Sequence, residues 1–211
     1  ISNKTKINNL IKINQINSVI HCAASLDVGE SELNPKKYYL NNVSNTKKLL
    51  EVCSENNIKN FIFSSTCAVY GNTQGNVDEN TITKPLSVYG KTKLKCENLL
   101  LKFSKKYNFN YAILRYFNVG GADLKNKIGC INKNNQLIKN LSTSIVKQKK
   151  KISVFGNNYD TNDGTCVRDY IYIDDISKVH CKILDIISNK NKSYLLNCGY
   201  GKGYSVLEII K

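Results

Sequence analysis

Hydrophobic and polar positions along the chain follow two patterns, one typical of buried strands and one typical of amphipathic helices. Runs of consecutive apolar residues, expected where both faces of a strand are covered, lie at 18–23, 60–65 and 111–116. Apolar residues at helical spacing lie at about 4–15, from Pro35 to about 56, and at about 87–107. This order predicts an α/β protein with a doubly wound parallel sheet and right-handed crossovers.

Beyond Asn118 the pattern is less regular, and a loop rich in Gly and Asn follows. The elements expected there are a helix at about 134–148, strands at 152–156, 168–173 and 194–199, a helix at about 174–188, and a helix from Ser205. Two parts are therefore predicted, 1–118 and 119–211, with some segments of the second part returning to the sheet of the first.

Length and composition set the broad class of the protein. The 211 residues, 41% of them hydrophobic, suffice for a folded core. No apolar run approaches the roughly 18 residues that span a bilayer, so no membrane association is expected. The chain opens with Ile1 and contains no Met, and we therefore expect a fragment.

The net charge of +15 raises the question of nucleic-acid binding. Arg115 and Arg168 are the two arginines, so 29 of the 31 basic residues are lysines. Base-edge contacts and bidentate phosphate contacts depend mainly on Arg, and the lysines are scattered apart from a run at 147–151. We expect no nucleic-acid partner and attribute the charge to biased composition.

The eight cysteines include no C-x-x-C pair, and the two histidines, His21 and His180, have no metal-ligand spacing. A zinc site is therefore not expected. Several cysteines lie in apolar stretches, where a reduced thiol behaves as a small hydrophobic group. This cysteine usage fits a protein of the reducing cytoplasm.

The main candidate for chemistry is the pair Tyr89 and Lys93, in the predicted helix 87–107. Residues at i and i+4 share one face of a helix. A tyrosine with a pKa of about 10 is a poor base near neutral pH, whereas a neighbouring ammonium favours the phenolate. We expect Lys93 to lower the pKa of Tyr89 toward useful acid–base catalysis.

Small and hydroxylated residues follow the predicted strands, where doubly wound sheets bind their ligands. They are Cys22-Ala23-Ala24, Ser64-Ser65-Thr66 and Phe117-Asn118. Each group would also suit a simple strand-to-loop turn. With Tyr89 and Lys93 downstream, a ligand site is the favoured interpretation.

Six segments together resemble the UDP-glucose 4-epimerases, a family of the extended short-chain dehydrogenase/reductase superfamily. In chain order they read HCAASLDVGES, NNVSNTKKLLEVC, FIFSSTCAVYG, SVYGKTK, LRYFNVGGA and DGTCVRDYIYIDD. The resemblance covers essentially the whole chain. It implies a Rossmann-type NAD-binding domain over 1–118 without its first three strands, and part of a small C-terminal UDP-sugar-binding domain over 119–211.

The resemblance also implies an activity. Such enzymes interconvert UDP-glucose and UDP-galactose through transient oxidation and reduction at C4, with a tightly bound NAD. By motif, Tyr89 would be the base for the 4-hydroxyl group, Lys93 would bind the nicotinamide ribose, and Thr66 would hydrogen-bond the 4-oxygen of the sugar. The substrate would be a UDP-hexose, and the full-length protein would form a homodimer.

The binding residues implied by the resemblance fall into two groups. Besides Tyr89 and Lys93, the cofactor contacts would be Cys22, Ala23, Ala24, Asn41, Ser64, Ser65 and Tyr116. The substrate contacts, besides Thr66, would be Asn118, Gln136, Ser153, Phe155 and Arg168. Arg168 would bind the diphosphate through its guanidinium fork, although an ion pair with Asp169 is the simpler alternative.

The chain departs from the family pattern in several respects, among them Ala24, where relatives commonly have Gly. It contains no glycine-rich phosphate loop, and Leu26 stands where relatives often have Lys. Strand 18–23 would then lack its first-strand neighbour and form an exposed apolar edge. We expect these 211 residues alone to bind NAD weakly and to aggregate.

Other functions stay open at this point. A nucleotide-sugar dehydratase would need an acid after Thr66, where Cys67 and Ala68 stand. A 4-epimerase of another UDP-sugar (arabinose, glucuronate or N-acetylhexosamine) is the nearer alternative, and a non-enzymatic NAD- or RNA-binding protein is more distant. The apolar residues of 49–53 and 94–101 suit either a dimer contact or the core.

Overall fold

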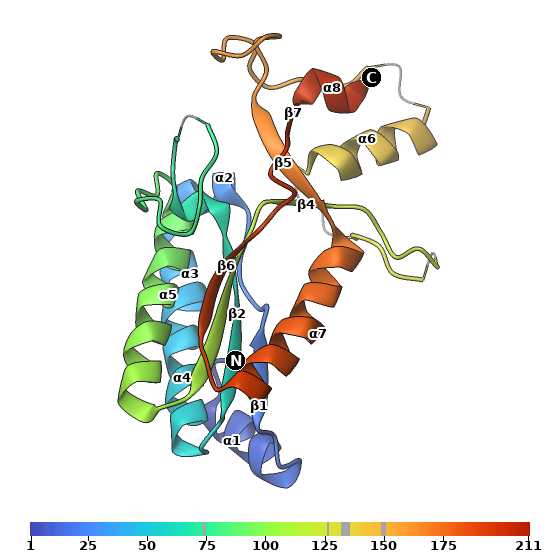
Figure 1. The fold of residues 1–211 in the computed structure, drawn as a ribbon. Helices are drawn as coiled ribbons and strands as arrows, with labels where there is room; N and C mark the ends of the chain where they lie inside the picture. Colours follow the sequence, from blue (N-terminus) through green and yellow to red (C-terminus); the bar gives the residue numbers. More distant parts are fainter. Residues whose placement is uncertain (74, 126, 132–135, 149–150) are drawn as a thin grey trace. The chain divides into compact units, whose positions relative to one another are not determined.

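The computed structural model describes residues 1–211 except 74, 126, 132–135 and 149–150 (Figure 1). The chain divides into two compact units. The first unit comprises Ile1–Arg115 and Val179–Asn197, and the second comprises Tyr116–Lys178 and Cys198–Lys211.

The first unit is built on a four-stranded sheet with the order β1-β2-β3-β6. The strands are β1 (Ser18–His21), β2 (Asn60–Thr66), β3 (Asn110–Tyr116) and β6 (Tyr194–Cys198). β1 and β2 pair in parallel, with Ser18 opposite Asn60 and His21 opposite Phe63. The predicted α/β class is confirmed.

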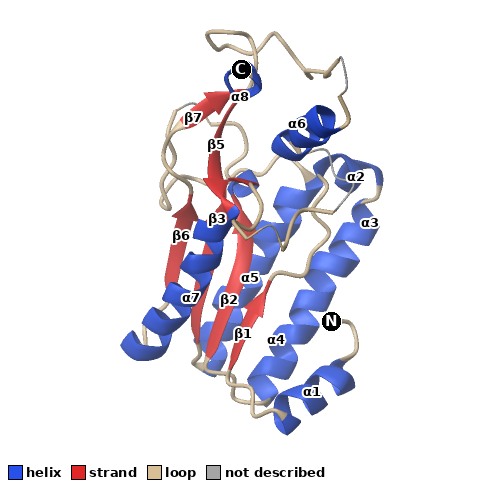
Figure 2. Cartoon of the chain, turned by 90° about the vertical axis from the view of Figure 1, so that its right-hand side faces the viewer, coloured by secondary structure: helices blue, strands red, loops and turns tan. Residues whose placement is uncertain are grey.

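Helices cover both faces of this sheet (Figure 2). α4 (Asn45–Glu55) and α5 (Val88–Tyr107) lie on one face, and α7 (Ile173–Lys190), whose C-terminal part belongs to the first unit, lies on the other. All seven residues of β2 are buried. The continuous apolar run that identified this strand in the sequence therefore reflects two covered faces.

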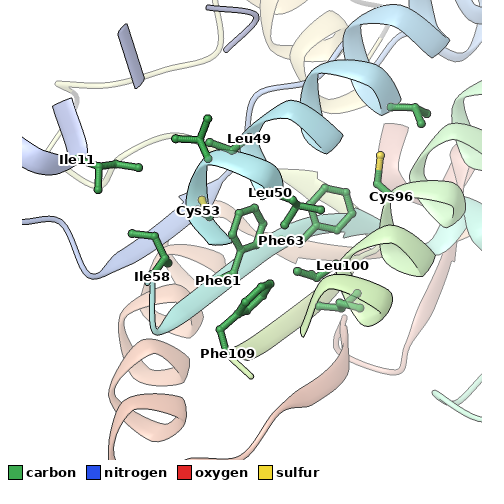
Figure 3. Close-up of a cluster of buried hydrophobic side chains, with 13 residues drawn as sticks. Ile11, Leu49, Leu50, Cys53, Ile58, Phe61, Phe63, Cys96, Leu100 and Phe109 are labelled. Carbon is green, nitrogen blue, oxygen red and sulfur yellow. The ribbon is translucent and has the colours of Figure 1, made fainter. Parts of the chain in front are cut away.

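A hydrophobic core lies between the sheet and the pair α4 and α5 (Figure 3). Phe61 and Phe63 of β2 belong to it, and Ile62 does not, because successive side chains of a strand point to opposite faces. Leu49 and Leu50 of α4 are also in this core. Of the two uses considered for the apolar residues of 49–53, the core is therefore the one observed.

Short helices connect these elements. In the first unit they are α1 (Lys4–Ile13), α2 (Val28–Leu33), α3 (Pro35–Tyr38), the π-helix η1 (Tyr39–Ser44) and the 3-10 helix η2 (Cys67–Val69). The side chain of Asp27 caps α2 by accepting a hydrogen bond of 2.7 Å from the backbone of Glu30. α3, η1 and α4 together occupy the helix predicted from Pro35 to about 56, whereas α2 was not predicted, because it is too short to show a helical period.

β1 forms one edge of the described sheet, as the sequence predicted. Ile20 in this strand is 45% exposed. A hollow of 390 Å³ lies beside it, and its lining is mostly apolar, including Leu10, Ile16 and Val19. An unpaired strand with an apolar surface is a template for pairing with other chains, so the expected tendency to aggregate stays a prediction with a structural basis.

The second unit contains a three-stranded sheet with the order β4-β5-β7. Its elements are β4 (Asn118–Gly120), α6 (Leu137–Val146), β5 (Val167–Tyr172), β7 (Gly203–Ser205) and α8 (Val206–Ile210), together with the start of α7. β4 runs parallel to β5, and β7 runs antiparallel to it. Ser205 and Glu208 form a capping box at the start of α8.

The strand predicted at 152–156 is wrong, because the structure has no regular element there. Its apolar side chains lie at the surface, and Phe155 is 77% exposed. Apolar alternation indicates a strand only where a partner supplies the ladder hydrogen bonds, and this segment pairs with no strand in the described part of the chain. The helix expected at 134–148 is observed at Leu137–Val146, and its first expected residues lie outside the described ones.

Candidate active site

The start of α5 places Tyr89 and Lys93 on one face of the helix. The hydroxyl of Ser87 caps the helix by accepting a hydrogen bond of 3.0 Å from the backbone of Gly90. Tyr89 therefore lies in the first turn, and Lys93 lies one turn later on the same face. The backbone N–H of Tyr89, which has no partner within the helix, donates to the hydroxyl of Ser31 at 3.1 Å.

Gly90 allows this helix start to approach the end of β2 closely. A Cβ at this position would lie 2.7 Å from the carbonyl oxygen of Ala68 and 3.1 Å from Pro85. Neither neighbour is the movable end of a flexible side chain. The glycine beside Tyr89 is thus required by packing, since any larger residue would push α5 away from the segment that follows Thr66.

Lys93 is 4% exposed, and its ammonium group lies at the end of β2. Nζ donates a hydrogen bond of 2.6 Å to the carbonyl oxygen of Ser64 and lies 4.8 Å from the ring centre of Phe63. Burial lowers the pKa of Lys93 to about 8, although the nearby Cys96, Cys22 and Glu97 favour its charged form. Lys93 is therefore a buried cation that can lose its proton near physiological pH.

Tyr89 differs from the expectation for its acidity. Burial raises the pKa of its phenol to about 12, although a hydrogen bond with the side chain of Thr66 acts in the opposite direction. Nζ of Lys93 lies 6.0 Å from the centre of the Tyr89 ring, and it donates to Ser64 instead. The prediction that Lys93 lowers the pKa of Tyr89 is therefore wrong for this structure. The effect of burial on Tyr89 is larger, and the ammonium group of Lys93 bonds Ser64 and not the phenol.

The three residues that end β2 contact α5 in succession. Ser64 is held through its carbonyl by Lys93, Thr66 hydrogen-bonds Tyr89, and the buried hydroxyl of Ser65 hydrogen-bonds Glu97. Thr66 also accepts a hydrogen bond of 3.2 Å from the backbone of Ala68 and begins η2. Ser65 is 2% exposed, so a cofactor contact by this residue would have to use its backbone.

The segment after β1 is held by a buried asparagine that the sequence analysis did not identify. Asn42, in η1, accepts a hydrogen bond of 2.8 Å from the backbone of Ser25 and donates one of 2.9 Å back to it. Its amide also donates to Thr92 of α5 at 3.3 Å. Its neighbour Asn41, an expected cofactor contact, is partly exposed and donates to the hydroxyl of Ser25 at 3.0 Å.

Within this segment, Cys22 and Ala23 are exposed and Ala24 is partly buried. The hydroxyl of Ser64 donates to Sγ of Cys22 at 3.2 Å. Hydrogen bonds with His180 and Ser64 lower the pKa of the Cys22 thiol, and the charge of Lys93 acts in the same direction. The structure therefore brings the expected residues Cys22, Ser64 and Lys93 together at the carboxyl ends of β1 and β2.

Apart from Thr66, the expected substrate residues lie in the second unit, where they are exposed. Ser153 and Phe155 lie in an irregular segment, and Asn118 is the first residue of β4. Gln136 is the N-cap residue of α6, but its side chain makes no capping hydrogen bond. Tyr116, an expected cofactor contact, ends β3 and is partly buried. The structure does not bring these residues into one cluster.

Arg168 is exposed on β5. Its guanidinium donates a hydrogen bond of 2.7 Å to the carbonyl oxygen of Val167. Asp169 accepts hydrogen bonds from the backbones of Tyr200 and Gly201, at 3.0 and 2.7 Å. Among the described residues, no ion pair joins Arg168 to Asp169, so the simpler alternative for this arginine is not observed.

Other chemistries receive no support from the part of the chain that the structure describes. It contains no group of three or more His, Cys, Asp or Glu side chains placed to hold a metal ion. None of its helices is both long and apolar enough to cross a membrane. All eight cysteines are free thiols.

One family model and several curated proteins match most of this chain. The model of the NAD dependent epimerase/dehydratase family matches residues 1–199. The chain is 36% identical over 207 residues to the UDP-glucose 4-epimerase of Azospirillum brasilense, which covers 97% of this chain and 60% of the relative. It is 37% identical to a probable UDP-arabinose 4-epimerase of Oryza sativa, covering 97% of this chain and 50% of the relative.

Solved structures show the same similarity. The UDP-glucose 4-epimerase of Brucella ovis in complex with NAD superposes with a TM-score of 0.91 at 34% identity, covering 98% of this chain and 64% of that one. The enzyme of Bifidobacterium longum in complex with NAD⁺ and UDP gives a TM-score of 0.89 at 36% identity, with 99% and 64% covered. The chain thus spans less than two thirds of the length of these relatives.

Proposed function

The chain belongs to the NAD dependent epimerase/dehydratase family, and from that premise we propose that the protein is an NAD-dependent UDP-glucose 4-epimerase. It interconverts UDP-glucose and UDP-galactose by transient oxidation and reduction at C4 of the sugar. The observation that carries this proposal is the hydrogen-bonded pair of Tyr89 and Thr66, with Lys93 one helical turn away at the same strand end.

The residues at this strand end suit a dinucleotide. Cys22 and Ala23 are small and exposed, so a cofactor can lie directly against the carboxyl end of β1. Asn41 and Ser64 supply an amide and a hydroxyl nearby, and Lys93 supplies a cation for a ribose hydroxyl. When bound, NAD supplies a hydride acceptor for C4 of the sugar and the hydride that is later returned.

The side chains of this chain handle the proton. Tyr89 accepts the proton of the 4-hydroxyl group as the C4–H bond breaks, and it returns that proton when the bond re-forms on the opposite face. Thr66 holds the 4-oxygen and, through its hydrogen bond, favours the ionised form of Tyr89. Because the pKa of Tyr89 is raised to about 12 with Lys93 in place, ionisation requires a further positive charge, which the oxidised nicotinamide would supply.

Arg168 is proposed to bind the diphosphate of the substrate. It is exposed and makes no ion pair among the described residues, so its guanidinium fork is available for bidentate phosphate binding. Asn118, Gln136, Ser153 and Phe155 remain proposed contacts for the sugar, diphosphate and uracil. The proposal includes a homodimer as the full-length form and a cytoplasmic location.

The test is conversion of UDP-galactose to UDP-glucose by the full-length gene product without added NAD. Activity is expected in the parent protein and is expected to be lost in Tyr89→Phe, which keeps the ring and removes the acid–base group. A folded parent protein that retains its cofactor and leaves UDP-galactose unchanged would overturn the proposal.

A different UDP-sugar is the second candidate. One relative of comparable identity is named a probable UDP-arabinose 4-epimerase, and a solved relative at 40% identity from Campylobacter jejuni is a UDP-Glc/GlcNAc 4-epimerase. Parallel assays with UDP-arabinose, UDP-glucuronate and UDP-N-acetylglucosamine separate these possibilities. Dehydratase activity is disfavoured because Cys67 and Ala68 supply no carboxylate after Thr66.

A further inference from the structure

A buried ion pair joins α5 to β3 next to the candidate catalytic residues of the first unit. Glu97 and Arg115 are 2% and 4% exposed. Arg115 donates two hydrogen bonds to the carboxylate of Glu97, from Nε at 3.1 Å and from a terminal nitrogen at 2.7 Å. Most buried charges are costly unless they are paired and fully hydrogen-bonded, and this pair meets both conditions.

The pair connects three elements around the site. Glu97 lies on α5, one turn beyond Lys93, and also accepts a hydrogen bond from the hydroxyl of Ser65 in β2. Arg115 lies on β3 and donates a third hydrogen bond of 2.9 Å to the hydroxyl of Tyr70, which follows η2. Its guanidinium also stacks on the Tyr70 ring, 4.9 Å from the ring centre.

The spacing of these contacts matches the spacing of the candidate catalytic groups. Tyr89, Lys93 and Glu97 occupy one face of α5 at intervals of four residues. They contact Thr66, Ser64 and Ser65 of β2, respectively. A slip or rotation of α5 along β2 would break the contact of Glu97 and displace Tyr89 from Thr66 together.

We propose that Glu97, anchored by Arg115, is a positioning residue that fixes the catalytic face of α5 against the end of β2. The inference rests on the proposed function, since it assigns Glu97 a part in the same reaction. Glu97 contacts neither substrate nor cofactor in this account. It acts through the helix that carries Tyr89 and Lys93.

The charge of Glu97 has a second effect, on Lys93. The titratable groups near Lys93 are His21 and Cys22 from β1 and its end, and Tyr89, Cys96 and Glu97 from its own helix. Glu97 is the carboxylate among them, and it favours the protonated form of Lys93 against the effect of burial. Its removal is therefore expected to lower the pKa of Lys93 further.

The variant Glu97→Gln, made in the full-length gene product, tests the proposal because it keeps the volume and removes the charge. The expected result is a fall in kcat of about a hundredfold, the order of loss that follows a misplacement of about 1 Å. KM is expected to stay within about twofold. Because the pKa of Lys93 is expected to fall, the alkaline limb of the pH–rate profile, where kcat declines, is expected to move to lower pH.

Leu100→Ala is the matched control. Leu100 lies on the same helix, is 1% exposed, and points into the hydrophobic core (Figure 3). This variant is expected to lower the melting temperature while leaving kcat per folded molecule and the pH profile unchanged. A Glu97→Gln protein that behaves in the same way would show that Glu97 is only structural, and would overturn the proposal.

Ser65→Ala covers the case in which Glu97→Gln does not fold. It removes the bond between helix and strand and leaves the ion pair of Glu97 and Arg115 intact. A fall in kcat of about tenfold, with the alkaline limb unmoved, is expected because the register is weakened while the charge near Lys93 is kept. An unchanged kcat per folded molecule would contradict the positioning role.

A titration without substrate separates this proposal from the proposed function. The difference in ultraviolet absorbance between a protein and its Tyr89→Phe partner reports the ionisation of Tyr89 alone. Adding Glu97→Gln is expected to shift that ionisation toward the ordinary tyrosine value of about 10, because Tyr89 becomes less buried. An unshifted titration would overturn the positioning role even in a protein that catalyses no epimerisation.

Discussion

The two units of this molecule hold their candidate functional residues in opposite ways. In the first unit, Lys93, Ser65 and Thr66 are buried, and each makes a hydrogen bond between α5 and the end of β2. In the second unit, Arg168 and Phe155 are exposed, and the hydrogen bond that Arg168 makes within the described part of the chain goes to a backbone carbonyl. The groups assigned to bond making are thus fixed by packing, while the groups assigned to recognition face solvent.

This difference has a physical basis. Acid–base groups work only when their geometry and pKa are set before the ligand arrives, and burial achieves both at a cost in stability. Groups that bind phosphate or a base can be ordered by the ligand itself. Substitutions in the first unit are therefore expected to change both chemistry and folding, and substitutions in the second unit to change mainly affinity.

The largest effect is expected from Tyr89→Phe in the full-length gene product. Loss of a general base typically lowers the rate by about 10²- to 10⁴-fold, and loss of one hydroxyl is expected to change the free energy of unfolding by about 1 kcal/mol or less. Progress curves with UDP-galactose and a denaturant titration measure the two quantities. If Tyr89→Phe retains more than about a tenth of the activity, Tyr89 is not the general base. The buried residues of the first unit would then not be the groups that handle the proton.

The next effect concerns the pH dependence of folding at Lys93. Its pKa is about 8 in the folded state and 10.5 in the reference state, so between these values the unfolded chain binds more protons and stability rises with pH. The rise is expected to be about 3 kcal/mol and to be absent in Lys93→Met. Denaturant titrations from pH 7 to 11 measure this rise. If the free energy of unfolding changes equally with pH in the two proteins, the pKa of Lys93 is not lowered by folding.

Arg168→Lys is expected to separate affinity from folding in the second unit. Loss of bidentate phosphate binding costs about 1.5 to 3 kcal/mol, which corresponds to a rise in KM of about tenfold to a hundredfold. Because Arg168 is exposed, the free energy of unfolding is expected to change by less than about 0.5 kcal/mol. An unchanged KM would show that Arg168 does not bind the substrate. A large loss of stability would show that Arg168 also contributes to folding.

The smallest effect on stability is expected at the edge strand β1. Ile20 is 45% exposed, so Ile20→Thr is expected to change the free energy of unfolding of these 211 residues by about 0.5 kcal/mol or less. The same change is expected to reduce aggregation, because it makes the exposed edge less apolar. Light scattering at equal concentrations measures this, and Leu33→Thr, at an exposed site away from the strand, is the control.

The sequence predicted the elements that show a clear period or a long apolar run. Strand β2 and helix α5 were identified close to their observed bounds for this reason. The three-residue strands β4 and β7 were missed because they are too short to alternate. The strand predicted at 152–156 is not observed, because its apolar residues have no partner strand among the described residues.

The candidate site was predicted only where local spacing was sufficient. The spacing of Tyr89 and Lys93 identified a shared helical face, and the strand ends identified Ser64 and Thr66. Glu97 was missed although it continues the same spacing, because its importance depends on Arg115, 18 residues away in the sequence. The acidity of Tyr89 was misjudged because burial, which raises its pKa, depends on the packing of distant segments.

In the proposed reaction, the hydrogen at C4 leaves the sugar as a hydride and returns to the same carbon. The most direct test uses UDP-galactose carrying deuterium at C4, incubated with the full-length gene product in unlabelled water. The expected product is UDP-glucose that retains the deuterium at C4, measured by nuclear magnetic resonance. Product that has exchanged this deuterium for solvent hydrogen would show that C4 does not react by transfer and return of a hydride.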